Sequence, residues 1–234
     1  MEARTVRIAE TRQRGRWDFQ PFSRATSLIH ARLESSPYPV VRLRDIVLVG
    51  TVGVAQGFSV AAEAAEGIPM ITGRHLTGGR ITDSLDEVRY LTLEEHEKLT
   101  GTQLKRGDVI VNLLMRPSVA AVYDAGGPAN IGARLVRLRL TDDIDPYYLV
   151  EYLNSEIGAS LMSMLATGSV MPMLTTQALL DLPVILPPLA EQRRISQEAL
   201  EARVEAERLT AQAEALRLRA QRGFLDSLAD GGAQ

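Results

Sequence analysis

Arginine, asparagine and small polar side chains recur in the turns that follow short apolar runs of this sequence. The planar fork of an arginine can bond to a guanine edge or a carboxylate, and the amide of an asparagine can bond to an adenine edge. Hydroxyl groups can contact phosphates, and a methionine can contact a thymine methyl group. The candidate residues for such contacts are Gln56, Ser59, Arg74, His75, Arg80, Asn112, Arg116, Ser118, Thr167, Ser169 and Met171.

Each candidate also has an ordinary structural use. Arg74 or Arg116 can pair with a surface carboxylate, and His75 can be a solvated loop residue. The arginine content is equally ambiguous, because Lys98 and Lys105 are the only lysines among 26 basic residues. A GC-rich genome produces the same preference for arginine without any function attached.

The residue patterns of common enzymes do not match this sequence. There is no cysteine, and the three histidines are scattered, so the sequence predicts no metal site. The glycines of GTVGVAQG (50–57) lack dinucleotide-binding spacing, and the acids of LEEHEKL (93–99) lack a nuclease arrangement. We therefore expect no catalytic residues and no cofactor, and we assign any catalysis to a partner.

Charge is unevenly distributed along the chain, whose formal net charge is −3. Residues 1–50 hold nine basic and five acidic residues, residues 51–188 hold ten and sixteen, and residues 189–228 hold seven of each. Non-specific DNA binders depend on a net positive surface, so any DNA contact here must be local and made by loops. No segment is apolar enough for a membrane span or a signal peptide, which predicts a cytoplasmic protein.

The elements that must position the candidate residues are short strands. Alternating or apolar runs bounded by turn residues predict strands within PVVRLRDIVLVG (39–50), GIPMITGRHL (67–76), GDVIVNLLM (107–115) and ARLVRLRL (133–140). A capping box at Thr92 and Glu95 predicts one short helix between them. The first 36 residues predict a strand from Arg4 to Ala9 and a helix near Ser23 to Leu33.

Helices and proline follow the strand-rich part. Asp145 as N-cap, with Pro146 behind it, predicts a helix over 145–166. Thr175 or Thr176 can cap a short helix that reaches Leu180. The apolar run LPVIL (182–186) then predicts a strand that its prolines confine to a sheet edge.

From Ala190 to about Leu228 the chain contains no proline and is rich in strong helix formers. A helix of this length reaches about 60 Å. Its coiled-coil seam, with alternating spacings of four and three, consists of Ile195, Ala199, Ala202, Ala206, Leu209, Ala213, Leu216 and Ala220. Leu200, Val204, Leu218 and Leu225 form a second, sparser apolar face. The alternative is a single amphipathic helix that folds back on its own domain.

Two passages resemble a known family. LKRGDVIVNLLMRP (104–117) and ATGSVMPMLTTQALLDLPVILPPLAEQRRI (166–195) are similar to one half of the specificity subunit of type I restriction-modification systems. The family's closing motif maps onto Gly168-Ser169, Pro172, Leu179 to Pro183, Pro187-Pro188-Leu189 and Glu191-Gln192. The resemblance covers about residues 39–228.

The resemblance implies an α+β fold, with a small β-rich target-recognition domain and short helices followed by one long coiled-coil-forming helix. It divides the chain into an N-terminal extension (1–36), the recognition domain (37–188), a dimerisation helix (189–229) and a disordered tail (230–234). The family's subunit usually carries two recognition domains, each of which reads half of a split DNA site. This chain has one domain and one helix, which implies a half-subunit that self-associates.

The implied partners are double-stranded DNA and a DNA adenine methyltransferase subunit, with a nuclease or translocase subunit as a further partner in phage defence. The rival interpretation is a coiled-coil scaffold that binds proteins and not DNA. The negative charge of residues 51–188 favours that rival.

Overall fold

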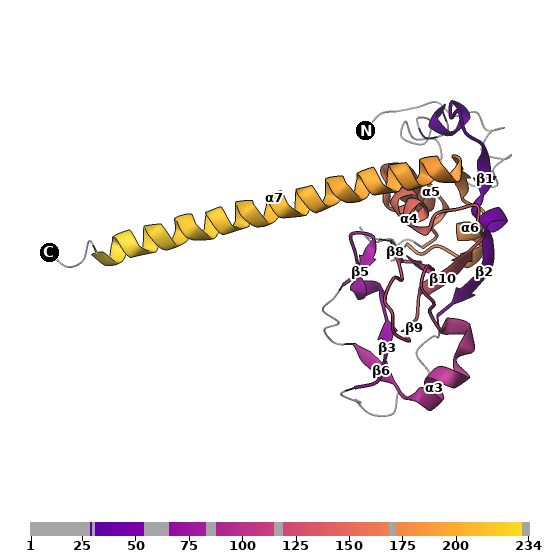
Figure 1. Ribbon diagram of the computed structural model, residues 1–234, viewed down its shortest axis with the longest axis horizontal. Coiled ribbons are helices and arrows are strands. Elements are labelled where there is room, and N and C mark those ends of the chain that lie inside the picture. The colour runs from indigo at the N-terminus through magenta and orange to yellow at the C-terminus, as the bar shows by residue number, and fades with distance from the viewer. Residues whose placement is uncertain are drawn as a thin grey trace. The chain divides into compact units, whose positions relative to one another are not determined.

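The computed structural model (Figure 1) describes residues 29, 31–53, 66–82, 88–114, 119–168 and 172–230, with residues 223 and 225–230 described by backbone alone. The predicted strand at 4–9 lies outside these residues, as does the predicted tail at 230–234 apart from Asp230, which is the last residue of a helix. Of the helix predicted near Ser23 to Leu33, Ile29 and residues 31–34 are described, and they are helical. The chain divides into two compact units, Met1–Gln192 and Arg193–Gln234.

The first unit is built on small sheets, as predicted. A four-stranded antiparallel sheet has the order β2-β10-β7-β8, and a three-stranded sheet has the order β6-β3-β9, in which β3 and β9 are parallel. The strands of these sheets are β2 (Val47–Val52), β3 (Ile68–Ile71), β6 (Arg89–Leu91), β7 (Val109–Asn112), β8 (Ala120–Val122), β9 (Asn130–Ile131) and β10 (Leu135–Leu140). Two-stranded antiparallel pairs join β1 (Val40–Arg42) to β11 (Pro183–Ile185) and β4 (Leu76–Thr77) to β5 (Arg80–Ile81).

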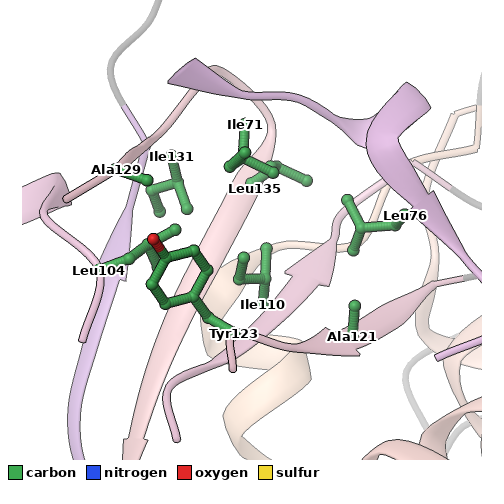
Figure 2. Packing of buried hydrophobic residues seen from close by; sticks show 9 residues of the cluster. All are labelled: Ile71, Leu76, Leu104, Ile110, Ala121, Tyr123, Ala129, Ile131 and Leu135. Atoms are coloured by element: carbon green, nitrogen blue, oxygen red, sulfur yellow. The ribbon is translucent and has the colours of Figure 1, made fainter. Parts of the chain in front are cut away.

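One hydrophobic cluster ties these sheets together (Figure 2). Its side chains come from strands of both larger sheets and from the β4–β5 hairpin, so they share a single core. The cluster consists of Ile71, Leu76, Leu104, Ile110, Ala121, Tyr123, Ala129, Ile131 and Leu135. Each of these residues is at least 94 % buried, which fixes the strand ends that carry the loops discussed below.

The helices are α3 (Leu93–Lys98), α4 (Pro146–Asn154), α5 (Glu156–Leu165), α6 (Thr176–Leu180) and α7 (Leu189–Asp230), with 3₁₀ turns η2 (Leu43–Ile46), η3 (Gly73–His75) and η4 (Thr100–Thr102). The predicted caps are confirmed: Thr92 and Glu95 form a capping box on α3, Asp145 caps α4, and Thr175 caps α6. The proline-flanked strand β11 lies at a sheet edge, as predicted, and pairs only with β1 among the described strands.

The single helix predicted over 145–166 is wrong. The backbone of Ser155 is extended, with φ −69° and ψ 165°, and its hydroxyl accepts a hydrogen bond from the Gly158 amide, so Ser155 caps a second helix. A Cβ at Gly158 would overlap the Tyr152 carbonyl oxygen. The chain therefore turns between α4 and α5 at a serine cap, where glycine allows the two helices to meet closely.

Gln192 explains why a Glu-Gln pair follows the two prolines. Its side chain is fully buried, and its Oε1 accepts a hydrogen bond from the Asp145 amide at 2.8 Å. Its Nε2 donates to the carbonyl oxygens of Asp143, at 3.0 Å, and Pro187, at 2.8 Å. One amide thus joins the first turn of α7 to the N-cap of α4 and to the proline pair.

Helix α7 contains 42 residues, which corresponds to about 63 Å at 1.5 Å per residue. Every side chain described from Val204 to Arg222 is exposed. Ion pairs within the helix join Arg194 to Glu198 and Arg208 to Glu205. Among the described residues, no helix combines the length and apolar character needed to cross a membrane.

Replacing Gln192 tests whether this amide holds the first unit together. We expect Gln192→Ala to lower the free energy of unfolding by about 2 kcal/mol, because three backbone groups lose their partner. Gln197→Ala, which removes an exposed glutamine from the same helix, should change it by less than about 0.5 kcal/mol. Urea unfolding of the two variants measures the difference, and equal effects would show that Gln192 has no special role.

Candidate nucleic-acid interface

Glycines allow three backbone segments to cross in close contact above the shared core. A Cβ at Gly53 would overlap the Gly132 carbonyl oxygen, and a Cβ at Gly132 would lie 3.2 Å from the Ile71 carbonyl oxygen. The Gly53 amide donates to the Leu135 carbonyl oxygen at 2.8 Å, and the Gly132 amide donates to that of Ile71 at 2.7 Å. The ends of β2, β3 and β9 therefore meet at one place, which we call the glycine junction (Gly53, Gly73 and Gly132).

A fourth segment joins the glycine junction through Asn112, the last residue of β7. The Asn112 side chain packs against Gly73, where a Cβ would lie 2.5 Å from its Nδ2. Its Oδ1 accepts a hydrogen bond from the Leu114 amide at 3.0 Å. The Leu113 amide donates to the Arg134 carbonyl oxygen at 2.9 Å. This bond ties the start of the loop between β7 and β8 to the turn between β9 and β10.

The far end of the same loop is held by Asn154, at the end of α4. Its Oδ1 accepts hydrogen bonds from the amides of Val119 and Ala120, both at 3.0 Å, and its Nδ2 donates to the Ala120 carbonyl oxygen at 2.9 Å. Residues 115–118, which contain the candidates Arg116 and Ser118, thus connect two anchored ends.

A fifth segment pairs with this loop. Met173 forms bridges with both Leu114 and Thr167, and the amides of Thr167 and Met173 each donate to the other's carbonyl oxygen at 2.9 Å. The Leu174 amide also donates to the Leu113 carbonyl oxygen at 2.9 Å. The structure therefore brings together residues 113–114, Thr167 and residues 173–174, which lie more than fifty residues apart in the sequence.

The β4–β5 hairpin completes the arrangement. It turns through Gly78 and Gly79, whose φ angles of 55° and 79° favour glycine, and the Gly79 carbonyl oxygen accepts a hydrogen bond from the Val122 amide at 3.2 Å. This bond places Arg80 beside β8, the strand that follows the anchored loop.

The predicted contact residues differ in exposure. Arg74, Arg80 and Thr167 are exposed, whereas His75 and Asn112 are only 2 % and 3 % exposed. His75 Nδ1 lies 3.0 Å from the Thr72 amide, which closes the turn that carries Arg74. Burial argues against base contacts by His75 and Asn112 and favours a role in shaping loops. The other candidates lie outside the described residues: Gln56, Ser59, Arg116, Ser118, Ser169 and Met171.

The segments that meet here share an unusual charge pattern. Across residues 53–62, 69–82, 112–119, 125–136 and 166–180 there is no Asp or Glu, and the charged residues are Arg74, Arg80, Arg116 and Arg134. The sixteen acids of residues 51–188 all lie elsewhere in the sequence. The regional charge that favoured a scaffold therefore does not describe these segments of the sequence.

Buried polar groups stabilise the strands beneath the loops, and sequence reasoning missed them. Asp108 is 2 % exposed and accepts two hydrogen bonds from the Arg139 guanidinium, at 2.9 and 2.8 Å, and one from the Lys105 amide at 2.8 Å. These hydrogen bonds raise the pKa of Arg139. Burial lowers the pKa of neighbouring Arg137, whose guanidinium donates to the Gln103 carbonyl oxygen. The only sign of the Asp108 site in the sequence is the passage Lys-Arg-Gly-Asp (105–108), whose residue types are typical of a turn.

The sequence was compared with known protein families and with curated proteins. Residues 36–212 match the family described as type I restriction modification DNA specificity domain. A search of curated proteins found no match.

Solved structures share the fold. One comes from a study of complex assembly and conformational transition of the type I R-M system. It has a TM-score of 0.56 at 20% identity, and the alignment covers 89% of this chain and 50% of the matched chain. The HsdS subunit from Thermoanaerobacter tengcongensis has a TM-score of 0.50 at 20% identity, and the alignment covers 86% of this chain and 48% of the subunit. The type IIG restriction endonuclease BpuSI has a TM-score of 0.58 at 10% identity, and the alignment covers 86% of this chain and 31% of the endonuclease. This chain thus spans half or less of each.

An added methyl group tests the glycine junction. We expect Gly53→Ala to lower the free energy of unfolding by about 1–3 kcal/mol, because its Cβ meets the backbone of Gly132 and not a movable side chain. Gly126→Ala is the matched control, since a Cβ there has no neighbour within 4 Å. Thermal unfolding measures the stability of both variants. A Gly53→Ala protein as stable as the control would show that Gly53 does not approach the Gly132 backbone closely.

Proposed function

Because the chain belongs to the type I restriction modification DNA specificity domain family, we propose that each copy reads one half of a split DNA site and directs a partner DNA methyltransferase to it. The chain itself serves recognition, and catalysis resides in the partner subunits.

The meeting of arginine-bearing segments without carboxylates carries this proposal. Arginine forks suit both guanine edges and phosphates, and local positive charge supports DNA binding even when the net charge of the chain is negative. Rigid strand ends beneath variable loops are a common way to present side chains to a ligand. The described residues of these segments are joined by the close contacts and hydrogen bonds given above, which supports their acting on a single stretch of DNA.

The exposed seam of α7 supports self-association in this proposal. In the seam, Leu209 and Leu216 are 51% and 66% exposed, and its alanines from Ala202 onward are exposed too. A second copy can cover this seam, which gives a two-fold reader of a pseudo-palindromic site.

DNA selection with single arginine variants tests the recognition proposal. From a random library, alone or with the methyltransferase subunit, the protein should enrich one motif. Arg74→Ala, Arg80→Ala and Arg116→Ala should each weaken binding to that motif by about 1–3 kcal/mol where the arginine contacts a base. Lys98→Ala, which removes an exposed charge from α3, should have little effect. Binding of a protein partner without any motif would support the scaffold instead.

Charge placed in the seam tests self-association. We expect Leu209→Glu and Leu216→Glu to convert a dimer to a monomer at micromolar concentration, because a buried carboxylate without a partner is costly. Leu218→Glu places the same charge on the second apolar face of α7 and should leave the dimer intact. Light scattering measures the mass of each variant. A wild-type protein that stays monomeric, alone and with its DNA, would contradict the proposal.

A further inference from the structure

Arg134 has a backbone conformation that its residue type disfavours. Its φ is +65°, and it is the only non-glycine residue with positive φ in the described parts of the chain. A side chain in this left-handed region crowds the neighbouring carbonyl oxygen, so glycine is the residue that sequences usually place there. Strain of this kind persists where the surrounding structure enforces it, and it is found often at functional sites.

The backbone around Arg134 is held from several sides. Its carbonyl oxygen accepts the Leu113 amide at 2.9 Å, the next carbonyl oxygen, of Leu135, accepts the Gly53 amide, and the Gly132 amide donates to Ile71. The turn between β9 and β10 is thus fixed to the ends of β2, β3 and β7. Arg134 takes part in these hydrogen bonds through its backbone carbonyl oxygen, which every residue type has. The described fold therefore does not depend on the arginine side chain.

The guanidinium of Arg134 is exposed and has no hydrogen bond or ion pair with any described residue. It stands at the root of the loop that contains Arg116, among segments that contain no carboxylate. Because its turn contains only Gly132, Ala133 and Arg134 between two strands, the backbone that carries this charge is held in place independently of the longer loops. Arginine contacts to phosphates set the register of a protein on DNA and carry no sequence information of their own.

We propose that Arg134 binds a backbone phosphate of the DNA at the glycine junction and so fixes the register of the reading loops. This role rests on the proposed function, since it presupposes that this edge of the fold faces DNA. The Arg134 side chain is a positioning group in this account, and it carries no base specificity of its own.

Arg134→Gly is an informative variant because glycine suits the left-handed backbone. We expect its melting temperature to equal or exceed that of the wild type. Its dissociation constants for the selected motif and for a scrambled duplex should rise by the same factor, about 5- to 20-fold, and the slope of log K against log salt should shrink by about one. Arg134→Lys should retain most of the affinity, because a phosphate accepts either cation.

The possible outcomes separate this inference from the proposed function. Unchanged affinity and salt slope in Arg134→Gly would overturn the phosphate contact, as would a loss confined to the selected motif, which indicates base reading. A wild-type protein that binds every duplex equally would refute sequence recognition, while the salt slope would still test Arg134. A wild-type protein that binds no DNA, alone or with its methyltransferase subunit, would refute both.

Discussion

The close approach of backbone to backbone at the glycine junction is the constraint on which the rest of this fold depends. Gly53 and Gly132 leave no room for a side chain between them, and Gly73 leaves none beside Asn112. Because β2 and β9 end where these backbones come into contact, the residues that follow these strands start close together. The Asn112 and Asn154 side chains accept hydrogen bonds from the amides of Leu114 and Val119, which fixes the chain on both sides of residues 115–118. A rigid base of this kind lets the loops vary without loss of the fold.

A buried side-chain amide, that of Gln192, marks the end of the first unit. It bonds to the N-cap of α4 and to the first proline of the pair, so the first turn of α7 belongs to the same hydrogen-bonded structure as the sheets. Beyond it the sequence changes from strand-forming runs to a helix whose side chains from Val204 to Arg222 are exposed. In this chain the passage 187–192 is therefore held by hydrogen bonds of the buried Gln192 side chain.

Local signals were read correctly from the sequence, and long-range ones were not. Thr92, Asp145 and Thr175 form the caps that their neighbours predicted, because capping depends on residues within one turn. The break at Ser155 was missed because its cap lies inside an apolar pattern that fits one continuous helix. The burial of His75 and Asn112 depends on strands distant in the sequence. The carboxylate-free segments were overlooked because charge was summed over long regions, and only the fold shows which described parts of these segments meet.

Hydrogen exchange with and without DNA most directly tests the claim that the segments meeting at the glycine junction form one DNA-binding surface. The account predicts that the selected duplex slows amide exchange together in peptides covering 53–62, 72–80, 112–119, 132–134 and 166–174, while α3 and the exposed part of α7 exchange as before. Protection confined to α3 or to α7, with no change in these segments, would contradict it.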